Sequence, residues 1–116
     1  MYQRLILIGN LGRDPEMRYT ADGKPVTSFS MATSRRYRDR DETTWFRISV
    51  WGSQAESCNQ YLHKGSRVLV EGRLVPDPAT GSPKVFQKRD GNWGSSFEVF
   101  AETIRFLTAK GESTGQ

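Results

Sequence analysis

The chain of 116 residues is very poor in cysteine and histidine, two residue types on which many enzymes and metal sites depend. It contains one cysteine, Cys58, and one histidine, His63, so it can form no internal disulfide and offers no Cys/His spacing for zinc. A Ser-His-Asp triad would have a single base and no nucleophile elbow. We therefore predict that the chain is not an enzyme, uses neither a metal nor another cofactor, and carries Cys58 in its core.

Long hydrophobic runs and phosphate-binding loops are also missing. The longest apolar run, Leu5 to Ile8, is far too short to cross a membrane, and the opening MYQRLILIGN does not resemble a signal or transit peptide. Gly9 and Gly12 in GNLG lack the third glycine and the following helix of a dinucleotide-binding motif. We expect a cytoplasmic protein that does not enter a membrane.

The excess of positive charge is small. There are 17 Lys and Arg residues against 13 Asp and Glu residues, which gives a net charge of +4. This balance permits an anionic partner such as nucleic acid, but many soluble domains carry as much charge. The composition alone therefore leaves the class of partner open.

Alternation and periodicity predict a chain built mostly from strands. Strands are expected at residues 4–10, 26–34, 43–52, 67–71 and 96–106, and one helix at residues 54–63 with Ser53 as its N-cap. This order fits an all-β, five-stranded Greek-key barrel of the oligonucleotide/oligosaccharide-binding (OB) fold, with the helix between strands three and four. Residues 76–93, rich in Pro, Gly and polar residues, would form a long hairpin arm between strands four and five. The barrel would occupy residues 1–107, and residues 108–116 would begin a flexible tail.

The third predicted strand has an unusual outer face. Residues two apart in a strand share a face, and the side chains predicted to face the core are Phe46, Ile48 and Val50. The opposite face carries Trp45, Arg47, Ser49 and Trp51. A half-buried strand normally presents a polar face to water, whereas this one presents two indoles and a guanidinium. Exposed tryptophans are favoured both in protein interfaces and in nucleic-acid grooves, so these residues alone do not decide between the two.

The segment before this strand, RRYRDRDE at residues 35–42, places Tyr37 among four arginines. One interpretation is a solvated hairpin tip, in which the acidic residues of the segment pair with the arginines. The other is a binding surface, because aromatic rings stack on bases and guanidinium groups neutralise phosphates. Tyr37 and Trp45 would lie at the ends of two strands joined by this segment, so we expect their rings to line one groove. Such a groove suits a single strand, since the bases of a duplex are already stacked on one another.

Four segments carry a family resemblance: LILIGNLGRDPEMRY at 5–19, SMATSRRYRD at 30–39, TTWFRISVWG at 43–52 and YLHKGSRVLVEGRL at 61–74. In this order and at nearly this spacing, the chain resembles the bacterial-type single-stranded DNA-binding proteins over roughly residues 2–107. The resemblance implies a five-stranded barrel that assembles as a homotetramer. It also implies a cytoplasmic, nucleoid-associated protein that coats single-stranded DNA in replication, recombination and repair, without catalysis.

The resemblance also implies roles for individual residues. The base-stacking aromatics would be Tyr37, Trp45 and Trp51, and Arg47 would contact phosphate. The further basic residues expected at the DNA are Arg35, Arg40 and Lys64. In the arm, Phe86 and Trp93 are candidates for another stacking residue. The opening strand is where related proteins pair their subunits, and Leu5 and Leu7 are assigned to this interface.

The last residues depart from the family pattern. Family members end in an acidic tip that recruits replication and repair proteins, whereas this sequence ends in AKGESTGQ. The sequence is therefore either a DNA-binding core or a form without the recruiting tail.

Two other functions stay open at this point. A cold-shock-type RNA-binding barrel would use similar physics, although the aromatic motifs of that family are missing. A protein-interaction barrel, such as a primosome-type relative, would bind oligonucleotides weakly and form a stable dimer. Preference for RNA would favour the first, and weak affinity for any oligonucleotide would favour the second.

Overall fold

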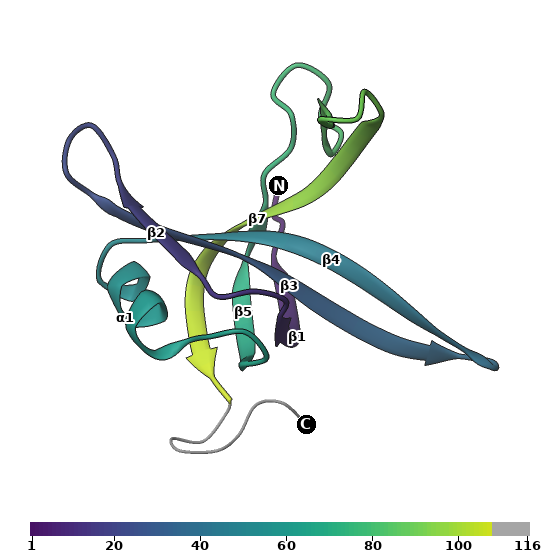
Figure 1. The fold of residues 1–116 in the computed structure, drawn as a ribbon, viewed down its shortest axis with the longest axis horizontal. Coiled ribbons are helices and arrows are strands. Elements are labelled where there is room, and N and C mark those ends of the chain that lie inside the picture. The colour runs from purple at the N-terminus through teal and green to yellow at the C-terminus, as the bar shows by residue number, and fades with distance from the viewer. Residues whose placement is uncertain (108–116) are drawn as a thin grey trace.

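The computed structural model describes residues 1–107, which form one barrel with projecting hairpins (Figure 1). Its elements are β1 (Leu5–Leu11), β2 (Glu16–Tyr19), β3 (Pro25–Tyr37), β4 (Arg40–Trp51), α1 (Ser53–Tyr61), β5 (Arg67–Leu74), β6 (Lys84–Gln87) and β7 (Trp93–Phe106). The predicted flexible tail, residues 108–116, lies outside the described residues. Within residues 1–107, no helix is long and apolar enough to cross a membrane.

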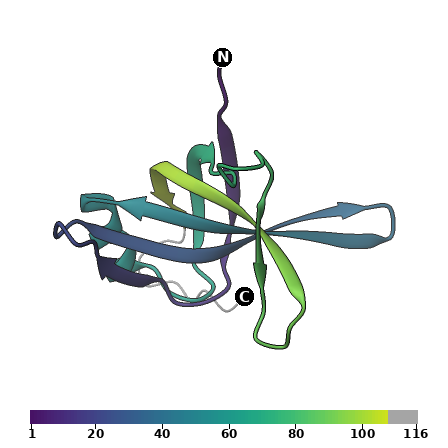
Figure 2. The ribbon, with the colours of Figure 1, turned by 90° about the horizontal axis from the view of Figure 1, so that it is seen from above.

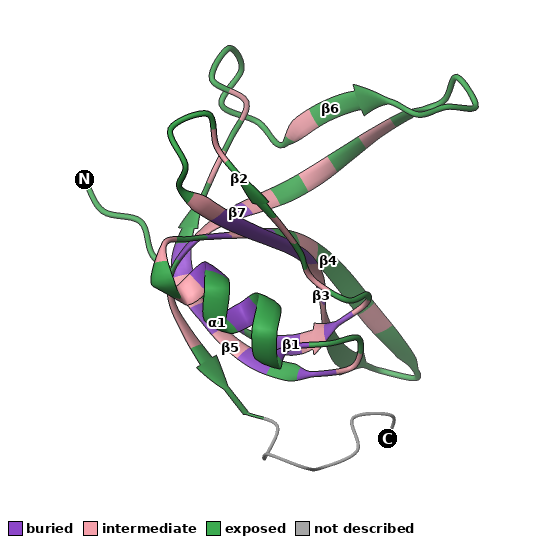
Figure 3. Ribbon diagram, turned by 60° about the vertical axis from the view of Figure 1, so that its left-hand side comes forward, coloured by how far each residue is buried: buried purple, intermediate pink, exposed green. Residues whose placement is uncertain are grey.

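Five of the strands close into a barrel. β1 pairs antiparallel with β5, β5 with β7, and β3 with β4, whereas β4 and β7 run parallel. The barrel closes where Asn10 and Leu11 of β1 pair with Ala32 and Met31 of β3. α1 connects β4 to β5 (Figure 3). It packs against β3 and β4. This strand order, with one helix between the third and fourth barrel strands, confirms the predicted OB fold.

The core is made of side chains from the five barrel strands and from the helical segment. Its buried members are Leu7, Leu11, Phe29, Met31, Ile48, Val50, Cys58, Leu62, Val68, Val70, Val99 and Ala101. The predicted alternation on β4 is confirmed, because Ile48 and Val50 are fully buried and Phe46 packs against the core. Cys58 also lies in the core as predicted. Burial raises the pKa of its thiol to about 12, which keeps the thiol neutral and unreactive.

The helix begins and ends differently from the sequence prediction. Its N-cap is Gly52 and not Ser53, because Gly52 has a φ of 74° and its carbonyl accepts the N–H of Ala55 at 2.9 Å. A positive φ is costly for any residue except glycine, so the chain turns at Gly52 and Ser53 is already helical. The helix ends at Tyr61, and Leu62 is the C-cap.

β3 and β4 extend further than the sequence predicts. They continue past the barrel through the charged segment 35–42 and form a projecting hairpin with its turn at residues 38–39 (Figures 1 and 2). Few apolar side chains mark this part of the hairpin as strand. Cross-strand ion pairs support it, and the closest joins Arg35 Nε to Glu42 Oε1 at 2.7 Å.

Two short strands, β2 and β6, were not predicted. β2 pairs with β3 and lies between the first two predicted strands, where the sequence predicts no strand. β6 pairs with the first residues of β7, so β7 begins at Trp93 and not at residue 96. The predicted long hairpin arm is confirmed, and β6 is its outgoing strand. Both short strands are largely exposed, and therefore show no burial pattern in the sequence.

The assignment of Leu5 and Leu7 to a subunit interface needs correction. Leu7 is 9% exposed and belongs to the core, and Leu5 packs against it. The outward side chains of β1 are Ile6 and Ile8, at 61% and 55% exposure. Alternation along the strand forces this division: the two leucines fill the barrel and the two isoleucines face out.

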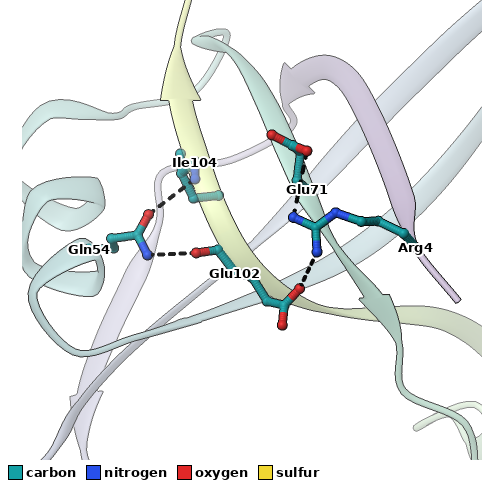
Figure 4. A network of polar contacts seen from close by, with 5 residues as sticks. All are labelled: Arg4, Gln54, Glu71, Glu102 and Ile104. Carbon is teal, nitrogen blue, oxygen red and sulfur yellow. Dashed lines mark hydrogen bonds and ion pairs between the residues drawn. The ribbon is translucent and has the colours of Figure 1, made fainter. Parts of the chain in front are cut away.

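A polar network ties the chain's opening residues and α1 to the barrel (Figure 4). Arg4 Nη1 lies 2.7 Å from Glu102 Oε1, and Arg4 Nη2 lies 3.6 Å from Glu71 Oε2. Gln54 of α1 donates to the carbonyl of Glu102 at 2.9 Å and accepts the N–H of Ile104 at 3.1 Å. One side-chain amide thus completes two backbone hydrogen bonds of β7 and fixes the helix against that strand.

Candidate nucleic-acid interface

The outer face of β4 carries the residues predicted for it. Trp45 is 53% exposed, Trp51 is 41% exposed, and Arg47 between them is exposed as well. The backbone of β4 is held from both sides, by β3 over its whole length and by β7 from Phe46 to Ser49. The two indoles and the guanidinium therefore project from one of the most rigidly supported strands of the fold.

β3 lies beside these side chains and contributes only small ones. Ala32 is the register partner of Trp45, and Ser30 is the partner of Arg47. Directly opposed residues share a face of the sheet, so a methyl group and a hydroxyl lie next to the large side chains of β4. This difference in size leaves a low floor beside the indole and the guanidinium.

A groove of about 350 Å³ joins this floor to the arm. Its lining residues are Ser30, Trp45, Phe46, Arg47, Phe86, Ser95, Ser96 and Glu98. Three of the sequence-predicted residues therefore meet at one place: Trp45, Arg47 and Phe86. The groove combines an indole, a phenyl ring and a guanidinium, which are the groups that stack on bases and neutralise phosphates.

The charges in the groove leave Arg47 available to an anion. Glu98 is the acidic residue in the lining, and it is engaged by Lys84 Nζ at 3.3 Å and by the Ser96 hydroxyl at 3.2 Å. No ion pair joins Arg47 to an acid within residues 1–107. Arg47 also borders a second, smaller pocket that contains Arg13.

Tyr37 does not join Trp45 in one groove, contrary to the sequence expectation. The β3–β4 register is continuous from Val26–Trp51 to Tyr37–Arg40, and it puts Tyr37 on the opposite face of the hairpin from Trp45. Tyr37 is still exposed, because the hairpin has left the barrel at this point. The two strands are longer than predicted and include Tyr37. Because Tyr37 is an odd number of positions from Ala32, the partner of Trp45, the two rings lie on opposite faces.

The arginines around Tyr37 divide into two groups. Arg35 and Arg36 are in cross-strand ion pairs with Glu42 and Asp41, at 2.7 and 3.4 Å, as the solvated-tip interpretation proposes. For Arg38 and Arg40 no ion pair exists within the described residues. The guanidinium carbons of Arg35 and Arg38 also lie 5.1 and 5.3 Å from the centre of the Tyr37 ring. Exposed pairs contribute little stability, so these arginines can exchange a carboxylate for a phosphate at small cost.

The two arm aromatics lie on opposite faces of the arm. Phe86 pairs with Gly94, whereas Trp93 pairs with Gln87, one position further along the hairpin. Phe86 lines the groove, and Trp93 does not. Trp93 is 68% exposed, and Val85, which shares its face by alternation, is exposed as well. Only Phe86 is thus positioned to act together with Trp45.

Arg18 is a candidate that the sequence did not reveal, because β2 was not predicted. Arg18 pairs with Val26, and Val26 pairs with Trp51, so the three residues form one row across the outer face. The Asp-Gly turn in ADGK was the available signal, since this dipeptide is typical of a hairpin between two strands. Lys64, in contrast, lies after α1, where its backbone N–H donates to Asp14 Oδ1 at 2.8 Å, and it does not line the groove.

Residues 2–107 match the model of the single-strand binding protein family. The chain belongs to this family. The match covers the entire barrel, both hairpins and the groove, and it confirms the resemblance that the four sequence segments indicate.

Relatives in this family are similar along most of the chain. The single-stranded DNA-binding protein of Wolinella succinogenes is 38% identical over 99% of this chain and 70% of its own length. That of Neisseria meningitidis serogroup A is 36% identical over 97% of this chain and 63% of its own length. Single-stranded DNA-binding protein 1 of Chlorobaculum tepidum is 47% identical over 70% of this chain and 56% of its own length. The chain thus spans between about half and 70% of the length of these relatives.

Proposed function

We propose that this chain binds single-stranded DNA with little sequence preference, and that it coats such strands in replication, recombination and repair. The observation that carries the proposal is the groove in which Trp45, Arg47 and Phe86 meet. The two exposed rings of the groove can stack on bases of any identity, and the guanidinium of Arg47 can hold the backbone beside them. Family membership and the names of the relatives support the same ligand.

The binding we propose is not catalytic. No group of three His, Cys, Asp or Glu side chains that could hold a metal ion exists within residues 1–107. The groove contains one carboxylate, on Glu98, which the ammonium of Lys84 engages. Replication and repair proteins are partners that the family resemblance alone implies, and the acidic tip that recruits them in the family does not occur in this sequence.

We further propose that the chain assembles as a homotetramer and that the outer face of β1 takes part. One edge of β1 pairs with β5 along the strand, whereas the other edge pairs with β3 only at Asn10 and Leu11. On that second edge, Leu5 to Gly9 have no strand partner in the described part of the chain. An unpaired edge with apolar side chains beside it favours pairing with another chain. Ile6 and Ile8 supply that apolar face, and the Arg4–Glu71 ion pair lies at its rim.

Titration with single-stranded DNA tests the proposed function directly. All three tryptophans are exposed, and two of them are on the proposed binding face, so an oligo-thymidine should quench their fluorescence. Quenching should saturate at a fixed number of nucleotides per protein and weaken as salt rises, whereas a duplex of the same length should have little effect. Stronger binding to RNA would favour the cold-shock alternative. No response to any oligonucleotide would reject the proposal in favour of a protein partner.

Removal of the Arg47 charge should change the salt dependence of binding. For single strands, each neutralised phosphate contributes about −0.7 to the slope of log K against log salt concentration. Arg47→Met should therefore flatten the slope by about 0.7, as measured by titrations at several salt concentrations. Lys24→Met is the matched control, because Lys24 lies in the β2–β3 turn, outside the groove. An equal change in both variants would assign the effect to net charge.

The arm supplies a second matched pair of variants. Phe86→Ala should weaken oligo-thymidine binding by about 1–3 kcal/mol, since it removes one of the two exposed rings of the groove. Trp93→Ala removes a larger and more exposed ring from the opposite face of the arm and should cost less. Equilibrium titration of both variants with oligo-thymidine shows which one loses more affinity. A larger loss for Trp93→Ala would move the DNA path to the outer face of the arm.

A further inference from the structure

Each of the two exposed rings in the groove, Trp45 and Phe86, lies against a glycine. The six-membered ring of Trp45 reaches from β4 across β3 to Gly12, just after the end of β1. A β-carbon at position 12 would lie 2.6 Å from Cζ3 and 2.8 Å from Cη2 of the indole. Any side chain at this position would therefore collide with the ring. The N–H of Gly12 donates to the carbonyl of Ser30 at 3.0 Å, which fixes the backbone beneath the indole.

The second ring has the same arrangement in the arm. Phe86 and Gly94 are direct cross-strand partners, and a β-carbon at position 94 would lie 3.1 Å from Cζ and 3.2 Å from Cε2 of the Phe86 ring. It would also lie 2.8 Å from Cε of Lys88. These distances are less tight than at Gly12, so the Phe86 ring would shift by a smaller amount.

The other glycines with a clear structural reason differ from these two. A β-carbon at Gly9 or Gly72 would overlap a backbone carbonyl of the neighbouring strand, so these two let strands approach closely. Gly23, Gly52, Gly81 and Gly91 have positive φ and open space around them, as turn glycines do. Gly12 and Gly94 have neither feature, because the atoms nearest to them belong only to side chains. The absence of a side chain at these two positions leaves room for the neighbouring aromatic ring.

We propose that Gly12 and Gly94 are positioning residues, which leave room for the edges of the Trp45 and Phe86 rings so that the groove stays open to a base. The inference rests on the proposed function. The Cζ3–Cη2 edge of the indole occupies the space that a side chain at position 12 would need, and the Cζ–Cε2 edge of the Phe86 ring does the same at position 94. Glycine at these positions therefore lets both rings keep the placement that leaves them open to a stacking base. A side chain at either position would push the ring into the groove, where it would occupy the space of the ligand.

A double-mutant cycle with oligo-thymidine tests Gly12. Gly12→Ala should weaken binding about five- to tenfold, and Trp45→Ala at least as much, within the range for loss of one stacking ring. The double variant should bind like Trp45→Ala alone, because without the indole the added methyl group has nothing to displace. Wild-type affinity in Gly12→Ala, or losses that multiply in the double variant, would overturn the proposal. The same cycle with Gly94→Val and Phe86→Ala tests the arm, with a smaller expected loss.

A measurement without DNA separates this inference from the proposed function. In a Trp51→Phe, Trp93→Phe background, Trp45 is the only indole. Gly12→Ala should then shift its emission to the red and raise its quenching by acrylamide, because the ring leaves the backbone and enters water. Unchanged emission and quenching would reject the positioning role, whether or not the protein binds DNA. Failure of the wild type to bind oligo-thymidine would instead reject the proposed function.

Gly23→Ala is the control for a general effect on stability. Gly23 has a φ of 84° and nothing within 4 Å of a β-carbon, so alanine there strains the turn and touches no ring. Its melting temperature should fall while its affinity for oligo-thymidine stays at the wild-type value. If the Gly23 variant lost as much affinity as Gly12→Ala, the Gly12 effect would reflect stability and the positioning role would be rejected.

Discussion

Trp45→Ala should lower the affinity for oligo-thymidine by about 1–3 kcal/mol, which is roughly a five- to 150-fold rise in Kd. Trp45 is the largest side chain in the groove lining and is half exposed. It lies next to Arg47, the one lining residue with an available positive charge. Loss of the indole should thus remove a stacking surface beside the proposed phosphate contact of Arg47, and we expect no other ring to replace it.

The variant should keep its fold, and this makes the result interpretable. The indole covers Gly12 and contributes nothing to the buried core, whose β4 members are Ile48 and Val50. Thermal unfolding followed by circular dichroism should show a melting temperature close to that of the wild type. Trp45→Phe, which retains a ring, should recover most of the affinity. If Trp45→Ala binds as tightly as the wild type, stacking at this residue is refuted.

Charge introduced on the outer face of β1 should break the assembly. In the variant Ile6→Asp with Ile8→Asp, two carboxylates would replace the exposed apolar side chains of the proposed interface. Burial of an unpaired charge costs several kcal/mol, so we expect at least about a hundredfold weaker association. Sedimentation velocity should show smaller species than the wild type, with an unchanged β-sheet spectrum. A folded variant that sediments like the wild type would move the interface to another surface.

Leu7→Asp is the matched comparison, one position along the same strand. Leu7 lies in the core, so an aspartate there would be buried without a partner and the barrel should unfold. Both variants place aspartate in the same short stretch of β1, but on opposite faces of the strand. Loss of folding in Leu7→Asp and loss of assembly in the isoleucine variant would confirm the division of β1 into an inner and an outer face.

The residues that could be predicted from sequence are those where one face of a strand is clearly apolar. On β4 the large apolar side chains alternate with large polar or aromatic ones, and this contrast is enough to assign both faces. On β1 the run Leu-Ile-Leu-Ile gives no such contrast. Both of its faces are equally apolar in sequence, so the pattern could not show that the leucines point inward.

The other differences between the predicted and the observed site come from strand pairing, which the sequence of one segment alone does not determine. The opposite faces of Tyr37 and Trp45, and of Phe86 and Trp93, depend on strand register, which the turn at residues 38–39 and the arm define. β2 and β6 are short and largely exposed, so neither shows a pattern of burial. The contacts of Gly12 and Gly94 with the two rings depend on the folded barrel and the paired arm, which bring these residues together.

The division of aromatic side chains between opposite faces restricts how stiff a ligand can be. The β3–β4 hairpin and the arm each carry exposed rings on both faces: Trp45 and Tyr37 on the β3–β4 hairpin, Phe86 and Trp93 on the arm. A strand that contacts both rings of a hairpin must bend around its edge. Duplex DNA has a persistence length of about 50 nm, roughly ten times the 49 Å length of this protein. Bending stiffness therefore excludes the duplex from such a path, and a flexible single strand can follow it.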